Sequence, residues 1–235
     1  MGGDINSRRG FLKLCAASAG AGMLPRFTWA MEDAPRTRLT DASGQPLKAS
    51  SIREHENWAF AYPYVSTPVL LMRLDDPTPR QALIYGRGAR PYYWPGGVGP
   101  QRTIVAYVAI CSHQLSYNSP AVSYLSYHRT RNRMSRHGRA ITCCVHGSVY
   151  DPALGGQVLS GPAPFPLAAV VLEHDEKTDG LTASGLVGTF LHRDFFRAHR
   201  RDLRKAYGRK GYREEVGETT TAMPLEQWTK LVTRC

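Results

Sequence analysis

The sequence predicts an all-β domain of antiparallel strands, and two observations support that fold class. Short apolar runs rich in branched residues recur between residues 61 and 191, and each is bounded by Gly, Pro, Asp or Ser. Hydrophobic residues make up 42% of the chain and charged residues 21%, which is the composition of a globular rather than a disordered protein. We expect strands at residues 69–74, 82–85, 103–110, 140–145, 167–172 and 181–187.

Residues 1–30 predict an export signal. Arg8 and Arg9 lie in a twin-arginine pattern, and a mildly apolar run follows at residues 14–24. A bilayer-spanning helix needs about 20 apolar residues, so this run is short for one, and small residues allow cleavage after Ala30. We therefore expect a periplasmic protein, or one on the extracytoplasmic face of the inner membrane. A signal retained as a membrane anchor is the alternative.

Three further segments complete the predicted organisation. Residues 31–60 are polar, punctuated by Pro and Ser and without periodicity, which predicts a linker before the β-domain at 61–191. Residues 92–97 predict an aromatic packing loop. Residues 192–235 predict a basic C-terminal helical extension, because residues 192–213 carry nine Lys or Arg and an apolar stripe at helical spacing.

The net charge of +11 predicts anionic partners. The chain has no basic motif interleaved with aromatic residues of the kind that reads nucleic acid, so we expect no nucleic-acid partner. The basic helix at 192–213 could instead bind an acidic protein or anionic lipid, and a merely solvated helix face is the alternative.

Two short Cys–His clusters follow expected strands. Cys111 and His113 form the first cluster, and Cys143 and His146 form the second. The chain has five cysteines, and this odd number, with two of them adjacent and near histidine, suits metal ligands better than a disulfide framework. The other histidines lie among charged or loop residues, where we expect them to be solvated.

The four ligands are compatible with two kinds of metal centre. In one class of [2Fe–2S] centre, two neutral histidines replace two anionic cysteines on one iron, which raises the reduction potential. A structural Cys2His2 zinc site uses the same four side chains. Zinc fingers usually place both cysteines in one half and both histidines in the other. Here each half holds one of each, which favours the iron–sulfur centre.

The two clusters and a later turn carry a family resemblance. Cys-Ser-His at 111–113, Cys-Cys-Val-His-Gly-Ser-Val-Tyr-Asp at 143–151 and Gly-Pro-Ala-Pro at 161–164 occur in that order. They resemble the two cluster boxes and the proline loop of Rieske proteins, in the style of cytochrome bc iron–sulfur subunits and the arsenite oxidase small subunit. The resemblance covers residues 103–190. It implies a Rieske-type antiparallel β-sandwich with a small cluster-binding subdomain.

The resemblance also implies a role for each site residue. Cys111 and Cys143 would bind the inner iron of one [2Fe–2S] cluster per chain, and His113 and His146 would bind the outer iron. Ser148 and Tyr150 match the hydroxyl pair that, in high-potential members, donates hydrogen bonds to the cluster and a ligand sulfur. Turn chemistry and packing are the alternative for that pair.

Three departures from the cytochrome bc pattern weaken membership of such a complex. Ser116 and Val145 stand where those subunits carry a disulfide between the boxes. Gln114 precedes the leucine that follows the first box directly in those subunits, and the insert at 114–142 is long and arginine-rich. Cys144 could pack as a small apolar residue, replace Cys143 as a ligand, or form a bridge with Cys235 after export.

The sequence therefore predicts an electron-transfer protein of the extracytoplasmic side rather than an enzyme by itself. Its partner would be a c-type cytochrome or another redox protein of a respiratory oxidoreductase. Quinol and a membrane quinol–cytochrome c oxidoreductase complex are the first alternative. A structural zinc-binding protein is the alternative of another class.

Overall fold

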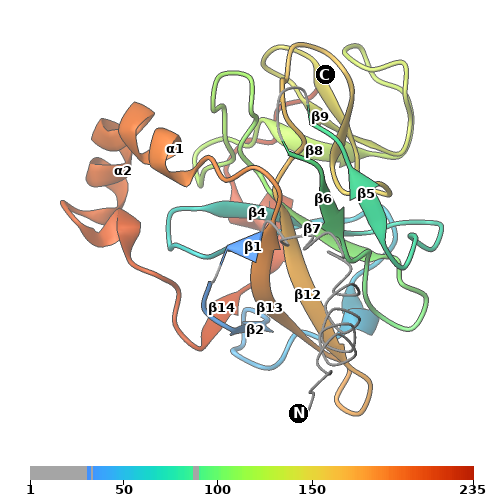
Figure 1. Cartoon of the computed structure of the whole chain (residues 1–235). Helices are drawn as coiled ribbons and strands as arrows, with labels where there is room; N and C mark the ends of the chain where they lie inside the picture. Colours follow the sequence, from blue (N-terminus) through green and yellow to red (C-terminus); the bar gives the residue numbers. More distant parts are fainter. Residues whose placement is uncertain (1–30, 33, 87–89) are drawn as a thin grey trace, which may run out of the picture.

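The computed structural model describes residues 31–32, 34–86 and 90–235, and it confirms the all-β fold class (Figure 1). The predicted export signal at 1–30 lies outside the described residues. The strands are β1 (Met31–Glu32), β2 (Thr37–Thr40), β3 (Asn57–Ala61), β4 (Pro68–Arg73), β5 (Ala82–Ile84), β6 (Tyr92–Trp94), β7 (Ile104–Val108), β8 (Leu125–His128), β9 (Ala140–Cys143), β10 (Ser148–Asp151), β11 (Gln157–Ser160), β12 (Ala169–Asp175), β13 (Gly180–Val187), β14 (Thr219–Thr221) and β15 (Met223–Pro224). The helices are α1 (His192–Ala198), α2 (Arg200–Tyr207) and α3 (Leu225–Trp228), with short 3-10 turns η1 (Ala49–Ser51) and η2 (Gly211–Arg213).

The main sheet has nine strands and nearly closes on itself. Its order is β14-β2-β13-β12-β7-β4-β3-β15, with β1 beside β13. Every pairing in this sheet is antiparallel except that of β14 with β2. The strands at its two edges, β14 and β15, are separated along the chain by Ala222 alone. This short link draws the two edges together, which leaves little edge exposed.

Both faces of the main sheet are buried, because successive side chains of a strand point to opposite faces. Leu71 and Ala106 belong to one apolar core, which α1 also covers, whereas Leu70 and Val105 belong to the other. The second core continues into the small sheet through Ile141 and other residues. Burial on both faces explains why β4 and β7 read as continuous apolar runs in the sequence.

The small sheet has the antiparallel order β11-β10-β9-β8 and carries the second Cys–His cluster. Of its four strands, the sequence predicted only β9. The other three are short and contain Ser, Tyr, His, Asp or Gln, so their apolar pattern is weak. The predicted loop at 92–97 begins with strand β6, which pairs with β5 and places Trp94 in the core.

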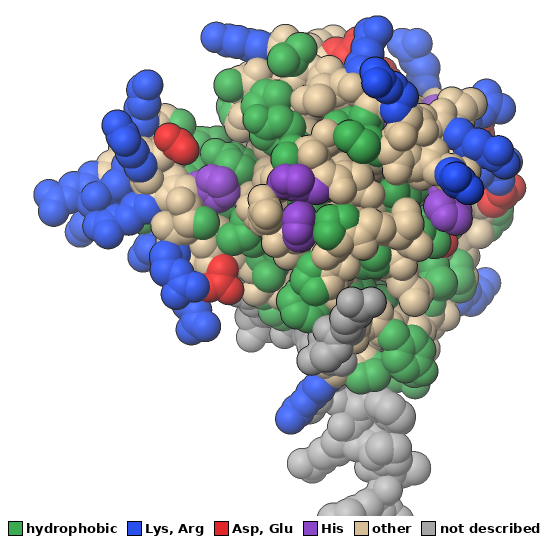
Figure 2. Space-filling view, turned by 90° about the horizontal axis from the view of Figure 1, so that it is seen from above, with side chains coloured by type: hydrophobic (Ala, Val, Ile, Leu, Met, Phe, Trp, Pro, Cys, Tyr) green, Lys and Arg blue, Asp and Glu red, His purple; other side chains and the backbone are tan. Residues whose placement is uncertain are grey.

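The basic C-terminal segment differs from the single predicted helix. It forms α1 and α2, which meet at His199, and the ring Nε2 of His199 lies 2.9 Å from the carbonyl oxygen of Leu115. Lys and Arg side chains gather over these two helices (Figure 2). The remainder is not an extension, because it supplies the edge strands β14 and β15 of the main sheet. No helix within 34–86 or 90–235 combines the length and apolar character that a bilayer crossing requires.

Residues 31–60 form part of the fold, so their prediction as a linker is wrong. They supply β2 and β3, and Leu39, Ile52 and Phe60 are fully buried. Irregular spacing hid these residues from a periodicity analysis.

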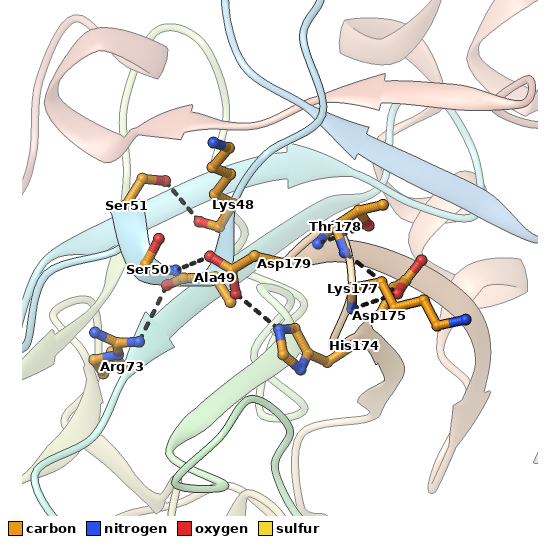
Figure 3. Close-up of polar contacts among 11 residues, drawn as sticks. Lys48, Ala49, Ser50, Ser51, Arg73, His174, Asp175, Lys177, Thr178 and Asp179 are labelled. Atoms are coloured by element: carbon orange, nitrogen blue, oxygen red, sulfur yellow. Dashed lines mark hydrogen bonds and ion pairs between the residues drawn. The ribbon is translucent and has the colours of Figure 1, made fainter.

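The turn between β12 and β13 holds η1 in place through Asp179 (Figure 3). Ala49 N–H donates to the Asp179 carbonyl. The Asp179 carboxylate accepts from Ser50 N–H at 3.0 Å and lies 2.8 Å from a His174 ring nitrogen.

Candidate metal centre

The first Cys–His cluster lies on a closed loop directly after the buried strand β7. Cys111 N–H donates to the Ser116 carbonyl at 2.8 Å, and Leu115 N–H donates to the Cys111 carbonyl at 3.0 Å. Leu115 adopts a positive φ of 57°, which lets the chain turn back within six residues. The result is a tight loop in which Cys111 is 1% exposed while the ring of His113 is half-buried.

The second cluster lies on the hairpin that joins β9 to β10. Cys143 pairs with Ser148 across the hairpin, and Gly147 N–H donates to the Cys143 carbonyl at 2.9 Å. Gly147 has φ +73°, a conformation that glycine adopts without steric cost. Cys143 therefore points into the core, and His146 is exposed at the tip.

A third loop, residues 161–165, packs against both clusters. A Cβ on Gly161 would lie 2.3 Å from the carbonyl oxygen of Gly147, so only glycine fits there. Ser112 Oγ donates to the Phe165 carbonyl at 2.8 Å and accepts from the Phe165 N–H at 3.2 Å. The sequence pattern did not predict a role for Ser112. Its position inside the Cys-Ser-His motif was the only sign that it could help to fix the first loop.

The fold brings the four predicted ligands together as two like pairs. The two thiols hydrogen-bond with each other. The rings of His113 and His146 lie 4.8 Å apart between centroids, edge to face at 86°. Sulfur is thus on the buried side and imidazole on the solvent side. That separation agrees with the predicted division of ligands between an inner and an outer iron, although the ligand assignment stays a prediction.

The two buried thiols titrate as a pair. The hydrogen bond from Cys143, helped by the Tyr150 hydroxyl, lowers the pKa of Cys111 despite burial. The same bond, together with burial, raises the pKa of Cys143. One sulfur therefore carries negative charge readily, and a cation bound beside it would favour ionisation of the second. Such thiolates are the form in which cysteine binds metal.

Two hydroxyls of β10 lie on the sulfur side of the site. Tyr150 is fully buried, and its Oη is 3.1 Å from Cys111 Sγ. Ser148 is also fully buried, but its Oγ makes no hydrogen bond with a described protein atom, although it lies close enough to Cys111 to lower the pKa of that thiol. Their role as hydrogen-bond donors to a cluster and to a ligand sulfur stays a prediction.

The residues present fit a [2Fe–2S] cluster. Besides Ser148 Oγ, the buried Nδ1 of His113 has no hydrogen-bond partner among the described atoms, and buried polar atoms rarely stay unpaired. His113 lies on the first loop, and Ser148 lies opposite Cys143 at the base of the second hairpin. A cluster bound there would give Nδ1 an iron to ligate and Ser148 a sulfide to donate to, which accounts for both.

The spacing fits a single metal ion less well. Among the described residues, two groups of three potential ligand atoms lie within 4.8 Å of one another, and neither includes any of the four predicted ligands. One group is an acidic cluster near His55, and the other contains Cys144 and Cys235, whose sulfurs are bonded together. A tetrahedral zinc ion would need four ligands in one such group.

Cys144 forms a disulfide with Cys235, with the two Cα atoms 5.4 Å apart. Cys111 and Cys143 are the free cysteines of the described chain. This settles the three alternatives left open for Cys144. The bridge fixes the C-terminal residue beside the second loop, where Arg133 N–H donates to the Cys235 carbonyl. The sequence could not reveal it, because the partners are 91 residues apart.

Burial also corrects the expectation that the remaining histidines are solvated. His192 is 6% exposed and packs against the Tyr64 and Phe196 rings. The side chain of His174 is 8% exposed beside Asp179. Neither lies in the candidate metal centre.

Fold and site together define an all-β protein with a candidate metal centre of two cysteines and two histidines at loop tips. No protein-family model matches the chain. Among solved structures, the chain is similar to the soluble domain of Rieske protein II (soxF) from Sulfolobus acidocaldarius, at 30% sequence identity and a TM-score of 0.44. The similarity covers 65% of this chain and 78% of that one.

Proposed function

We propose that this chain is a Rieske-type electron-transfer protein, with one [2Fe–2S] cluster held by Cys111, Cys143, His113 and His146. The observation that carries the proposal is the segregation of two buried thiols from two outward imidazoles, with the Tyr150 hydroxyl 3.1 Å from Cys111 Sγ. When bound, such a cluster takes up and releases one electron.

The residues of the chain divide the work in this proposal. The cysteines hold the inner iron inside the core, where water has no access to their sulfurs. The imidazoles face outward, and the exposed His146 offers an edge to a redox partner. Imidazole becomes more basic when an electron enters a centre that it ligates, so a proton can follow the electron onto an outer ring nitrogen.

Tyr150 and Ser148 tune the centre. Hydroxyls directed at sulfur stabilise the additional negative charge of a reduced centre more than they stabilise the oxidised one, and they therefore raise the potential. Burial, and next the neighbouring Cys111, raise the pKa of Tyr150, so that its hydroxyl remains a donor. We accordingly place the potential in the upper part of the Rieske range, which runs from about −150 to +300 mV.

We place the protein on the extracytoplasmic side, as partner or subunit of a respiratory oxidoreductase, with a c-type cytochrome or another redox protein as acceptor. The twin-arginine pattern in residues 1–30 supports the location. The pattern fits the cofactor, because twin-arginine export carries folded proteins whose cluster has already been assembled on reduced thiols.

The test is an electron paramagnetic resonance spectrum of the purified, reduced protein during a redox titration, with iron and sulfide determined in parallel. The expected result is a Rieske spectrum with two irons and two sulfides per chain. Zinc bound in place of iron, with no paramagnetic signal on reduction, would contradict the proposal. His113→Cys serves as a probe of ligation, because replacing one of the two neutral imidazoles by an anionic thiolate would lower the potential.

A further inference from the structure

Two arginine-rich segments flank the candidate centre. The helical arm, residues 192–213, carries nine Lys or Arg against Asp194 and Asp202, and most of its basic side chains are exposed. The insert arm, residues 129–139, carries five arginines, all exposed, and no acidic residue. Of these five, Arg139 is paired with Asp75 and Asp76.

Each arm is attached to one of the two cluster loops. In the helical arm, His199 lies 2.9 Å from the carbonyl oxygen of Leu115, two residues beyond His113, and Phe195 packs edge to face on Tyr117 at 4.8 Å between centroids. In the insert arm, Met134 lies against Gly147, with Sδ 3.5 Å from the position of a Cβ on that glycine. The two basic arms are therefore held at fixed places beside the two imidazoles.

The surface between the arms is uncharged. Residues 104–128, 140–150 and 157–172, which contain the three loops of the site, include no Asp, Glu, Lys or Arg. Figure 2 shows Lys and Arg side chains gathered at opposite sides of this face, with histidine, apolar and uncharged side chains between them. A neutral centre inside a charged rim is the arrangement of a specific protein interface.

We infer that this face is the docking surface for an acidic redox protein, whose own neutral centre covers the imidazole edges while its acidic rim meets both arms. The inference rests on the proposed function and names the charge of the partner. Opposite charges around a small contact raise the association rate more than the affinity, which suits a partner that must leave after each electron.

The test uses the complete, cluster-loaded protein and two soluble c-type cytochromes of similar potential, one acidic and one basic. Stopped-flow mixing of the reduced protein with each oxidised cytochrome gives the second-order rate. We expect the acidic cytochrome to react at least tenfold faster at low salt. Its rate should fall at least tenfold between about 20 mM and about 300 mM salt, as the Debye length shortens from about 20 Å to about 6 Å.

Charge reversals locate the docking surface. Two double variants test the arms: Arg133→Glu with Arg136→Glu in the insert arm, and Arg201→Glu with Lys205→Glu in the helical arm. We expect each to lower the second-order rate with the acidic cytochrome at least fivefold at low salt. The matched control is Arg38→Glu with Arg53→Glu. It changes the net charge equally, but in the 31–60 segment, at the end of the main sheet away from the centre (Figure 1). We expect it to slow the reaction less than twofold.

Three results overturn the inference: arm variants that match the control, a basic cytochrome that reacts as fast, or rates that do not respond to salt. Co-sedimentation with vesicles of phosphatidylglycerol and phosphatidylcholine tests the lipid alternative. If the arm variants no longer bind the vesicles but still react with the acidic cytochrome at the parent rate, the arms bind lipid and the inference is wrong. The spectrum of the reduced cluster in each variant reports its integrity. If the protein holds no cluster, the proposed function fails by itself, and calorimetric binding of the acidic cytochrome still tests the docking surface.

Discussion

Replacing Tyr150 by Phe tests the contact between this hydroxyl and Cys111 with little other disturbance. The substitution removes one oxygen and keeps the ring, which is fully buried between the two sheets. The lost bond is the one of 3.1 Å between Oη and Cys111 Sγ. When Cys111 is a metal-bound thiolate, it has no proton to donate, so the tyrosine is the donor in this bond.

The size of the effect follows from the change in charge on the acceptor. A hydrogen bond between neutral groups contributes about 1 kcal/mol, and one to a charged group about 1.5–3 kcal/mol. One added electron increases the negative charge on the sulfur, and the whole difference between these two cases would strengthen the bond by about 0.5–2 kcal/mol on reduction. Since 59 mV corresponds to about 1.4 kcal/mol for one electron, Tyr150→Phe should lower the midpoint potential by about 20–85 mV.

The assay is a redox titration monitored by the spectrum of the reduced cluster, at fixed pH and salt. Tyr107→Phe is the matched control: it removes a buried hydroxyl that donates to the Pro152 carbonyl at 2.7 Å, in the same core but not to a cysteine. The control should lower the stability and leave the potential unchanged. A Tyr150→Phe potential within about 10 mV of the parent, with an intact cluster, would refute the reasoning.

Three further predictions concern the neighbouring features. Ser148→Ala should also lower the midpoint potential in the same titration, because its Oγ is buried beside Cys111 and has no other hydrogen-bond partner among the described atoms. Burial lowers the pKa of His192 from 6.5 to about 4. The unfolded chain therefore binds its proton more readily, and stability is full above pH 6.5 and declines as the pH falls towards 4. Urea unfolding of the parent and of His192→Phe should diverge over that window, by at most about 3 kcal/mol. An unchanged pH dependence in the variant would contradict the role of His192. Cys235→Ser opens a bridge between residues 91 apart, and should lower the free energy of unfolding by about 2–5 kcal/mol without shifting the potential by more than a few mV. Equal stability of the two proteins under oxidising conditions would show that the bridge is not formed in solution.

The sequence predicted those strands that bury both faces. β4 and β7 read as apolar runs because neither face of the main sheet meets water there, and they were found to within a few residues. It missed β2 and β10, which are short and mix polar with apolar residues. Such strands are stabilised by pairing with distant partners, and local sequence carries little trace of that pairing.

The sequence by itself determined the four candidate ligands, because cysteine and histidine at these spacings have few other chemical uses. Their type and order alone predicted a cluster rather than zinc. Tertiary structure decided what lies around them: the Cys144–Cys235 bridge, the Phe165 backbone on Ser112, and the two arginine-rich arms beside the imidazoles. Each of these joins segments far apart in the chain. Their proximity is produced by packing of the two sheets, which no single stretch of sequence encodes.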